Sequence, residues 1–376
     1  MNHIIHVAMI LQSYYPRIGG AERQVALLAP LLHERNVDIT VITRHYPGLL
    51  TFEHINGVPV HRVPCPGPKA VAALIFSLRA LLLLNRIKPD IIHAHELLSP
   101  TTTAIMAKTI FGQPLVVKTL RGGKLGDIAK IKKRSNAQLW INTICNKVDA
   151  FAVISKEIDG ELSDIGVDAK KRHKIPNGVD TTLFCPARLQ EELRHSLQIA
   201  SGPVLVFSGR LDPEKRIDML LSAWKDIRTT LPGATLLLVG DGSDSEKLKK
   251  LATPGVIFTG RVDDVLPYLQ AADIFILPSE TEGLSNSLLE AMSTGLAVIS
   301  TNVGGSSDVV VDGETGKIIP INDIHALKQA ILSLCADPVE RKRLGQHARE
   351  KIIHEYSLAQ TATRLNTLYI KLLEEK

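Results

Sequence analysis

Two carboxylates, Glu282 and Glu290, stand eight positions apart in a segment whose pattern predicts a buried strand, a loop and a helix. Gly283 follows the first carboxylate in the loop, and the second carboxylate lies inside the helix. A helix N-terminus offers backbone N–H groups and a partial positive charge, so it suits an anionic ligand. Ionised carboxylates accept hydrogen bonds from the hydroxyls of a sugar or a ribose. The segment therefore predicts a ligand that carries both phosphate and sugar.

A structural role competes for Glu290. The run Ser287-Leu288-Leu289-Glu290 has the S-x-x-E pattern of a capping box, in which the carboxylate only satisfies the start of a helix. Glu282 stands in the loop, where no comparable structural role applies. Both interpretations of Glu290 stay open from the sequence.

Two cationic residues follow the predicted strand 204–208. Arg210 and Lys215 are five positions apart across a turn that contains Pro213. Arginine supplies a planar fork of donors and lysine a mobile point charge, so together they could converge on one diphosphate. Taken alone, the segment also fits a solvated turn.

Two further motifs occur in the first half of the chain. Gly19 and Gly20 follow the first predicted strand and open a helix, which lets the backbone approach a phosphate, although a plain strand-to-helix turn fits equally. His93 and His95 end another strand and share one of its faces. With only Glu96 as a further ligand we expect no metal there. We favour a histidine that bonds a substrate, and a structural role for one of the pair stays open.

The elements that must position these residues alternate between short β-branched strands and helices, which is typical of βαβ units and buried parallel sheets. The fold class is therefore α/β, with two Rossmann-like domains. We place the first domain at 1–185, the second at 186–356 and a C-terminal helix at 357–376, because residues 176–186 are rich in turn formers. Such sheets bind ligands at the carboxyl ends of their strands, so we expect the site in a cleft between the domains.

Composition indicates a soluble globular protein of 376 residues, 45% hydrophobic and 22% charged. Four scattered cysteines favour a reducing cytoplasm. The apolar run 70–84 is too short to span a bilayer, and we expect a core helix there.

Residues 1–185 carry 23 Lys and Arg against 14 Asp and Glu, whereas the remainder carries 21 against 25. A cluster at Lys130–Arg134 is either a solvated helix face or a dock for an anionic membrane surface or a phosphorylated acceptor.

Taken together, the motifs resemble the retaining glycosyltransferases of family 4, which have the GT-B fold. The similarity covers essentially the whole chain and includes the E-x7-E spacing. The motifs, in the order of the family, are GGAERQV, DIIHAHE, AVIS, IPNGVD, GRLDPEK, LLLVGDG, ADIFILPSETEGLSNSLLEAM and NVGGSSDVVVDGETG. The resemblance implies transfer of a sugar from a nucleotide-diphosphate-sugar to a glycan or lipid-linked acceptor. It also implies retention of configuration, no metal, no cofactor and no nucleic acid partner.

The resemblance also implies roles for single residues. Arg210 and Lys215 neutralise the donor diphosphate, and Glu290 holds the ribose hydroxyls. Glu282 contacts the donor sugar, and the backbone N–H groups that assist it are those of Gly283 and Leu284. From the first domain, Gly20 lies against the phosphates and His95 binds the transferred sugar. The C-terminal helix of the family crosses back to the first domain.

Three departures from the family pattern concern details of the site. Arg216 stands where glycine is common, Asp308 where glutamate is usual, and residues 118–123 replace a loop that usually contains histidine. The alternatives are a nucleotide-sugar epimerase or sugar synthase of the same fold, or an inactive subunit that binds a nucleotide-sugar. Neither the base of the donor (UDP, GDP or ADP type) nor the acceptor follows from the motifs. The basic first half favours a lipid-linked or otherwise anionic acceptor and a position at the inner face of the membrane.

Overall fold

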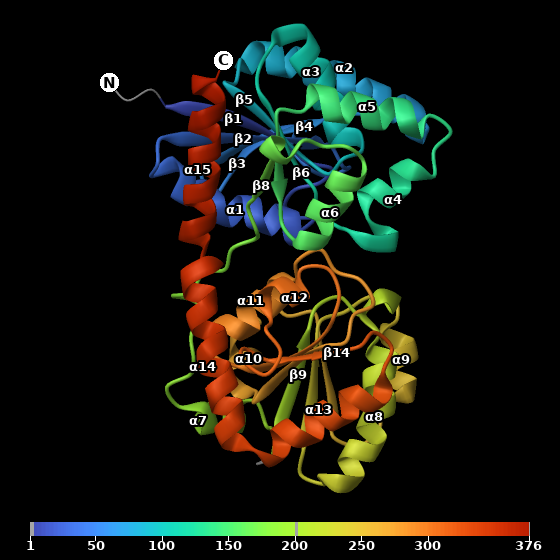
Figure 1. The fold of residues 1–376 in the computed structure, drawn as a ribbon, viewed down its shortest axis with the longest axis vertical. Helices are drawn as coiled ribbons and strands as arrows, with labels where there is room; N and C mark the ends of the chain where they lie inside the picture. Colours follow the sequence, from blue (N-terminus) through green and yellow to red (C-terminus); the bar gives the residue numbers. More distant parts are fainter. Residues whose placement is uncertain (1–3, 200–201, 376) are drawn as a thin grey trace. The chain divides into compact units, whose positions relative to one another are not determined.

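The chain forms two compact units. The computed structural model describes residues 4–199 and 202–375. The first unit contains Met1–Asn177 together with Leu358–Lys376, and the second contains Gly178–Ser357. Each unit is an α/β domain built on its own sheet (Figure 1).

The division falls eight residues before the expected boundary at 185/186. Residues 178–185 belong to the second unit because their backbone groups bond there. The N–H of Val179 donates to the carbonyl of Tyr356 at 2.9 Å. The carbonyl of Phe184 accepts from Ser293 Oγ at 2.6 Å and from Arg349 at 2.9 Å. Most of the turn-rich run 176–186 therefore lies inside the second unit.

The first unit contains an eight-stranded sheet in the order β3-β4-β2-β1-β5-β6-β7-β8, parallel except for the edge strand β3. Its strands are β1 (Ile5–Ile10), β2 (Val37–Arg44), β3 (Phe52–Ile55), β4 (Val58–Val63), β5 (Ile91–His95), β6 (Leu115–Lys118), β7 (Ala150–Val153) and β8 (Arg172–Lys174). The α-helices are α1 (Gly20–His33), α2 (Lys69–Ile87), α3 (Ser99–Phe111), α4 (Asp127–Lys132), α5 (Ala137–Lys147), α6 (Lys156–Asp164) and α15 (Leu358–Glu374), and the 3₁₀ helices are η1 (Gly123–Leu125) and η2 (Ala169–Lys171).

One hydrophobic core joins the central strands to α1 and the C-terminal helix α15. Leu365, Leu368 and Leu372 are buried there with Tyr369. Successive strand residues point to opposite faces of the sheet, and α2, α3 and α5 cover the other face (Figure 1). Since both faces are covered, strands such as β5 and β6 are buried along their whole length.

The second unit contains a six-stranded parallel sheet in the order β11-β10-β9-β12-β13-β14. Its strands are β9 (Val204–Ser208), β10 (Thr235–Val239), β11 (Val256–Gly260), β12 (Ile274–Leu277), β13 (Ala297–Thr301) and β14 (Lys317–Ile319). The α-helices are α7 (Gln190–Ser196), α8 (Ile217–Thr230), α9 (Ser245–Leu251), α10 (Leu266–Ala271), α11 (Asn286–Ser293), α12 (Ser306–Val309), α13 (Ile324–Ala336) and α14 (Pro338–Glu355), and η3 (Pro213–Lys215) is a 3₁₀ helix.

In both sheets the strand order changes direction at the strands that lead into the predicted motifs. In the first unit β1 lies between β2 and β5, and in the second β9 lies between β10 and β12. The loops that follow such neighbouring strands leave a crevice at the carboxyl end of the sheet, where ligands bind in folds of this type. The topology therefore puts the candidate residues of each unit where this fold binds ligands.

Candidate active site

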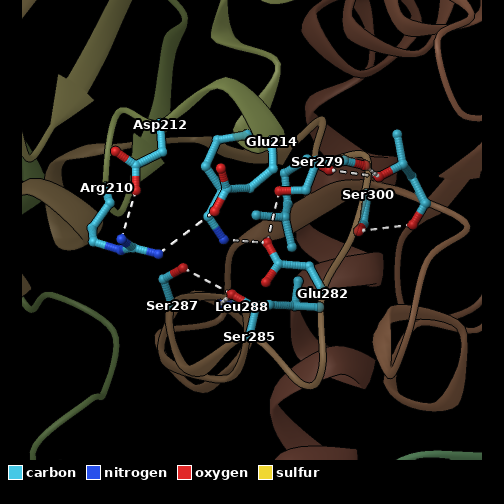
Figure 2. Close-up of polar contacts among 12 residues, drawn as sticks. Arg210, Asp212, Glu214, Ser279, Glu282, Ser285, Ser287, Leu288 and Ser300 are labelled. Atoms are coloured by element: carbon cyan, nitrogen blue, oxygen red, sulfur yellow. Dashed lines mark hydrogen bonds and ion pairs between the residues drawn. The ribbon is translucent and has the colours of Figure 1, made fainter. Parts of the chain in front are cut away.

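Lys215 and Glu282 form an ion pair at the carboxyl end of the second sheet. Lys215 ends η3, after β9, and Glu282 lies in the loop after β12. The lysine Nζ is 2.6 Å from the glutamate Oε1, and both side chains are mostly buried. Ser279, which is fully buried, donates from its Oγ to the same carboxylate oxygen at 2.7 Å (Figure 2). The structure thus brings two of the predicted residues together and adds a serine that the sequence analysis missed.

Arg210 lies on the same side of the site but is exposed. Its guanidinium is 2.6 Å from Asp212 and 3.6 Å from Glu214 (Figure 2). Burial acts to raise the pKa of Asp212, but hydrogen bonds from Ser243 and the charge of Arg210 leave that pKa below its ordinary value. The carboxylate therefore stays ionised and holds the guanidinium where solvent, or a ligand, can reach it.

Glycines let the loops of the site pack backbone against backbone. A Cβ on Gly240 would collide with the carbonyl of Gly209, and one on Gly242 would lie 2.6 Å from Leu211, so the loop after β10 supports the arginine loop. A Cβ on Gly304 would collide with the carbonyl of Glu282. These contacts require glycine, because no other residue leaves room for the approach.

Helix α11 begins beside Glu282, and its N-cap residue bears on the capping-box interpretation of Glu290. Ser285 is the N-cap residue, and its Oγ accepts a hydrogen bond from Leu288 N at 3.3 Å. The competing capping box from Ser287 to Glu290 is therefore wrong, because Ser287 already lies inside the helix. Glu290 is in the second turn and 5% exposed. Gly283 and Leu284 lie directly before the cap, in the loop that contains Glu282 and leads into the N-terminus of α11.

In the first unit, His95 ends β5 with no hydrogen-bond partner on either ring nitrogen among the described residues. It stacks on His93 with the ring centroids 4.7 Å apart. Burial lowers the pKa of both histidines, that of His93 to about 3, so both rings are neutral near pH 7. His93 contacts the hydroxyl of Tyr369 on α15 at 2.7 Å and has the structural role left open above. Buried orphan nitrogens are rare, so His95 is the member of the pair that is placed to meet a ligand.

A buried lysine lies beside the histidines. His95 pairs in register with Lys118 of β6, and the Lys118 ammonium donates to Asn177 Oδ1 at 2.9 Å. Burial lowers the pKa of Lys118 to about 8. The Oγ of Thr119, the next residue, is also buried without a partner among the described residues. The run 118–123, noted above as a departure from the family pattern, thus contributes polar groups to the carboxyl end of the first sheet.

The glycine pair opens α1, as expected. Gly19 is the N-cap, and Glu22 accepts from its N–H at 2.9 Å and from Ser13 Oγ at 2.7 Å. A Cβ on Gly19 would lie 2.8 Å from the Glu22 carboxylate. Gly20 is thereby held at the first position of the helix, and Glu22 is a second residue that the sequence analysis left without a role.

Glu96 follows His95 in an unusual backbone conformation, with φ at 82°. Burial, followed by the charge of Asp127, raises the pKa of Glu96 to about 7. Within residues 4–199 and 202–375, no three His, Cys, Asp or Glu side chains are grouped to hold a metal ion. The Glu96 carboxyl is thus a polar group at the carboxyl end of the first sheet whose charge changes near neutral pH.

Comparisons with known proteins identify the family and the fold. The sequence model described as Glycosyltransferase Family 4 matches residues 18–183, and that described as Glycosyl transferases group 1 matches residues 202–337. Together they cover more than half of the chain. A similar solved structure is sucrose-phosphate synthase from Thermosynechococcus elongatus, with a TM-score of 0.85, 23% identity, and coverage of 99% of this chain and 100% of the other. The fold is therefore GT-B.

Two curated relatives match along almost their whole length. The UDP-Gal:alpha-D-GlcNAc-diphosphoundecaprenol alpha-1,3-galactosyltransferase of Escherichia coli is 27% identical over 99% of this chain and 98% of its own. The GDP-mannose-dependent alpha-mannosyltransferase of Mycolicibacterium smegmatis is 28% identical over 93% of each chain. The chain belongs to glycosyltransferase family 4 and is a glycosyltransferase. No finding favours an epimerase, a sugar synthase or an inactive subunit.

Proposed function

We propose that the chain transfers a sugar from a nucleotide-diphosphate-sugar donor to a glycan or lipid-linked acceptor, with retention of configuration and without a metal ion. The single observation that carries the proposal is the contact between Lys215 and Glu282 at the start of α11. It puts a cation for phosphate and an acceptor for sugar hydroxyls within one hydrogen bond of each other.

The donor diphosphate is assigned to Arg210 and Lys215. Both cations lie at the carboxyl end of β9, and their carboxylate partners hold them there. Glu290 is assigned to the ribose, and the backbone of Gly283 and Leu284 to the donor beside Glu282. From the first unit, Gly20 is assigned to the phosphates and His95 to the transferred sugar, for which its unpartnered ring nitrogens suit a hydroxyl.

The proposed reaction proceeds at one face of the sugar. The bond from the anomeric carbon to the phosphate oxygen breaks, and the diphosphate leaves with the bonding pair. The acceptor hydroxyl oxygen bonds to the same face of that carbon, and its proton passes to the departing phosphate oxygen. The charge that develops on the diphosphate is opposed by Arg210 and Lys215, an effect on the order of a few kcal/mol. A double displacement would need a carboxylate nucleophile on the opposite face, and we assign none.

The two relatives support the class of substrates. One is named for UDP-Gal and the other for GDP-mannose, so a nucleoside-diphosphate sugar is the proposed donor, with its base to be measured. The first relative is also named for a diphosphoundecaprenol-linked sugar. A lipid-linked diphosphate is the acceptor class that suits the basic first half of this chain. We place the protein in the cytoplasm, peripheral to the membrane, and its four cysteines are free thiols.

The finer claims are tested on the reaction itself. With the donor identified by ligand binding, the anomeric configuration of the product is read by NMR. We expect it to equal that of the donor, and inversion would contradict the front-face scheme. Turnover is compared with and without EDTA, and loss of activity on chelation that Mg²⁺ or Mn²⁺ restores would contradict the metal-free assignment.

A further inference from the structure

The outer face of α2 carries a stripe of exposed apolar side chains. Its members, which we call the α2 stripe, are Val71, Leu74, Leu78 and Leu82, exposed by 49%, 57%, 50% and 72%. At about 100° and 1.5 Å per residue, these positions fall within an arc of about 80° and a length of about 16 Å. Apolar residues scattered singly on a surface are ordinary, but a contiguous stripe marks an interaction site.

The opposite face of α2 is committed to the fold. Ala72, Phe76 and Ala80 are buried, and Ser77 Oγ lies 2.8 Å from Thr103 Oγ1 of α3. By length and composition alone α2 could cross a membrane, with a mean hydropathy of 1.8 over its most apolar 18-residue window. Because one face packs on the sheet and on α3, the folded helix is instead suited to lie in the plane of a surface, as interfacial helices do.

The helices on this face of the sheet are basic. Helices α2, α3 and α5 lie side by side (Figure 1) and contain no Asp or Glu. Their basic residues are Lys69, Arg79, Arg86, Lys108 and Lys147, of which Lys108 is paired with Asp149. On the helix projection, Arg79 and Arg86 flank the α2 stripe on one side. The end of α4 and the turn that joins it to α5 add the exposed Lys132, Lys133 and Arg134, and the neighbouring Asp127 is buried and paired with Lys130.

We propose that this face of the first unit docks on an anionic lipid bilayer, with the α2 stripe at the boundary between headgroups and acyl chains and the basic residues on the headgroups. Apolar insertion and attraction to anionic lipid act together in such surfaces, and neither alone gives stable binding. The inference rests on the proposed function in one respect, because a lipid-linked acceptor is presented at a membrane. It assigns to α2 and its neighbours a role that the sequence analysis assigned to the Lys130–Arg134 cluster alone.

Charge decides between a bilayer and a second copy of the chain. A two-fold contact through the α2 stripe would set the same basic layer of each copy against the other. The exposed Lys69, Arg79 and Arg86 of one copy would then face those of the other, and repulsion between like charges opposes that contact. An anionic bilayer attracts the basic residues instead of repelling them, and burial of the α2 stripe stabilises the contact in either case.

The test is flotation of the full-length protein with vesicles of phosphatidylcholine alone or mixed with phosphatidylglycerol. We expect binding to the mixed vesicles at low salt that falls as salt rises, because attraction between charges in water is screened. The variant Leu78→Ser/Leu82→Ser should bind about tenfold more weakly or worse, since two leucines no longer enter the boundary. Leu189→Ser, at a leucine of the second unit that is 60% exposed, is the matched control and should bind as the wild type.

The charge arm compares Lys133→Glu with Lys225→Glu, at an exposed lysine of the second unit. We expect Lys133→Glu to bind the mixed vesicles more weakly than the wild type, and Lys225→Glu to bind them as the wild type does. Equal binding to neutral vesicles, no binding at all, or unchanged binding of the stripe variant would overturn the proposal. A dimer in light scattering that the stripe variant dissociates would assign the face to a second copy instead. Nucleotide binding by the same samples is measured without vesicles, so failure of the membrane proposal is distinguishable from failure of the donor site.

Discussion

The Nζ of Lys215 and the Oε1 of Glu282 lie 2.6 Å apart, although the two residues are 67 positions apart in the sequence. Lys215 belongs to the GRLDPEK motif and is assigned to the donor diphosphate, whereas Glu282 belongs to the E-x7-E segment and is assigned to the donor sugar. Their contact means that the phosphate and sugar ends of the proposed site are one electrostatic unit, fixed further by Ser279.

The contributions of Lys215 and Glu282 to the free energy of unfolding should be strongly coupled. In a double-mutant cycle of Lys215→Met and Glu282→Gln, followed by urea unfolding, we expect a coupling free energy of about 1–3 kcal/mol, because a mostly buried charge loses its partner in each single variant. The matched control is the exposed pair Lys328 and Asp226, 2.8 Å apart, with an expected coupling below about 1 kcal/mol. Equal coupling in the two cycles would count against a desolvated pair.

Loss of either proposed phosphate ligand should lower turnover, and for the exposed Arg210 the loss should leave stability nearly unchanged. Arg210→Ala removes an exposed guanidinium, so we expect little change in the urea midpoint but a fall in kcat of roughly 10²–10³-fold, the usual effect of one group that stabilises developing charge. Lys215→Ala should lower turnover similarly. Lys225→Ala serves as the control in single-turnover assays. Near-normal rates in both Arg210→Ala and Lys215→Ala would remove the phosphate role.

Gly304 should be required for the site rather than for the fold alone. Gly304→Ala places a Cβ against the carbonyl of Glu282 and also imposes a positive φ on alanine. Gly313→Ala imposes a similar φ, 72° against 50°, with no atom within 4 Å of the new Cβ. We expect the control to lose about 1 kcal/mol of stability and keep its nucleotide affinity. Gly304→Ala should weaken nucleotide binding in calorimetry, and an affinity equal to the control would contradict the packing argument.

Glu96 should make stability fall as pH rises. Burial and the charge of Asp127 raise its pKa to about 7 in the folded chain, against an ordinary value of 4.5. The folded state therefore binds more protons than the unfolded state between these values, and stability decreases across that window. Glu22, Arg121 and Lys130 also act on this carboxyl.

The variant Glu96→Gln isolates the effect. At pH 8 it should be more stable than the wild type by on the order of 3 kcal/mol, and at pH 4 the difference should vanish. Urea midpoints of both proteins, with the exposed Glu374→Gln as control, measure the change. A difference that is the same at both pH values would indicate packing rather than ionisation.

Local patterns predicted the elements that the site depends on. Parallel strands buried on both faces have continuous apolar sequences, so β9 was predicted with the bounds 204–208 that the structure has, and the loops after such strands held the motifs. The E-x7-E spacing and the GRLDPEK run carried enough type and order to indicate a phosphate and a sugar. Edge strand β3 is not evident from its own sequence, because it is short and its pairing with β4 rather than a local pattern makes it a strand.

Features set by contacts distant in sequence could not be read from local patterns. The contact of His93 with Tyr369 joins residues 276 positions apart. Ser285 rather than Ser287 caps α11, although both fit a serine cap and only the backbone decides between them. Helix α14 has little helical periodicity in its sequence, because its buried stripe is narrow and consists of Leu344, Gly345, Ala348 and Ile352. The junction at Asn177 depends on where the bonds of Val179 and Phe184 go, not on turn residues.

The most direct test of the central claim is a thermal-shift panel of UDP, GDP, ADP and their common sugar conjugates, without added metal. A ligand that binds only the folded protein raises its melting temperature by mass action. We expect one nucleotide family to stabilise the wild type and the control Lys225→Ala, and to lose that effect in Glu290→Ala and Lys215→Ala. Stabilisation that survives in both site variants, or the absence of a shift with every nucleotide, would contradict the donor site described here.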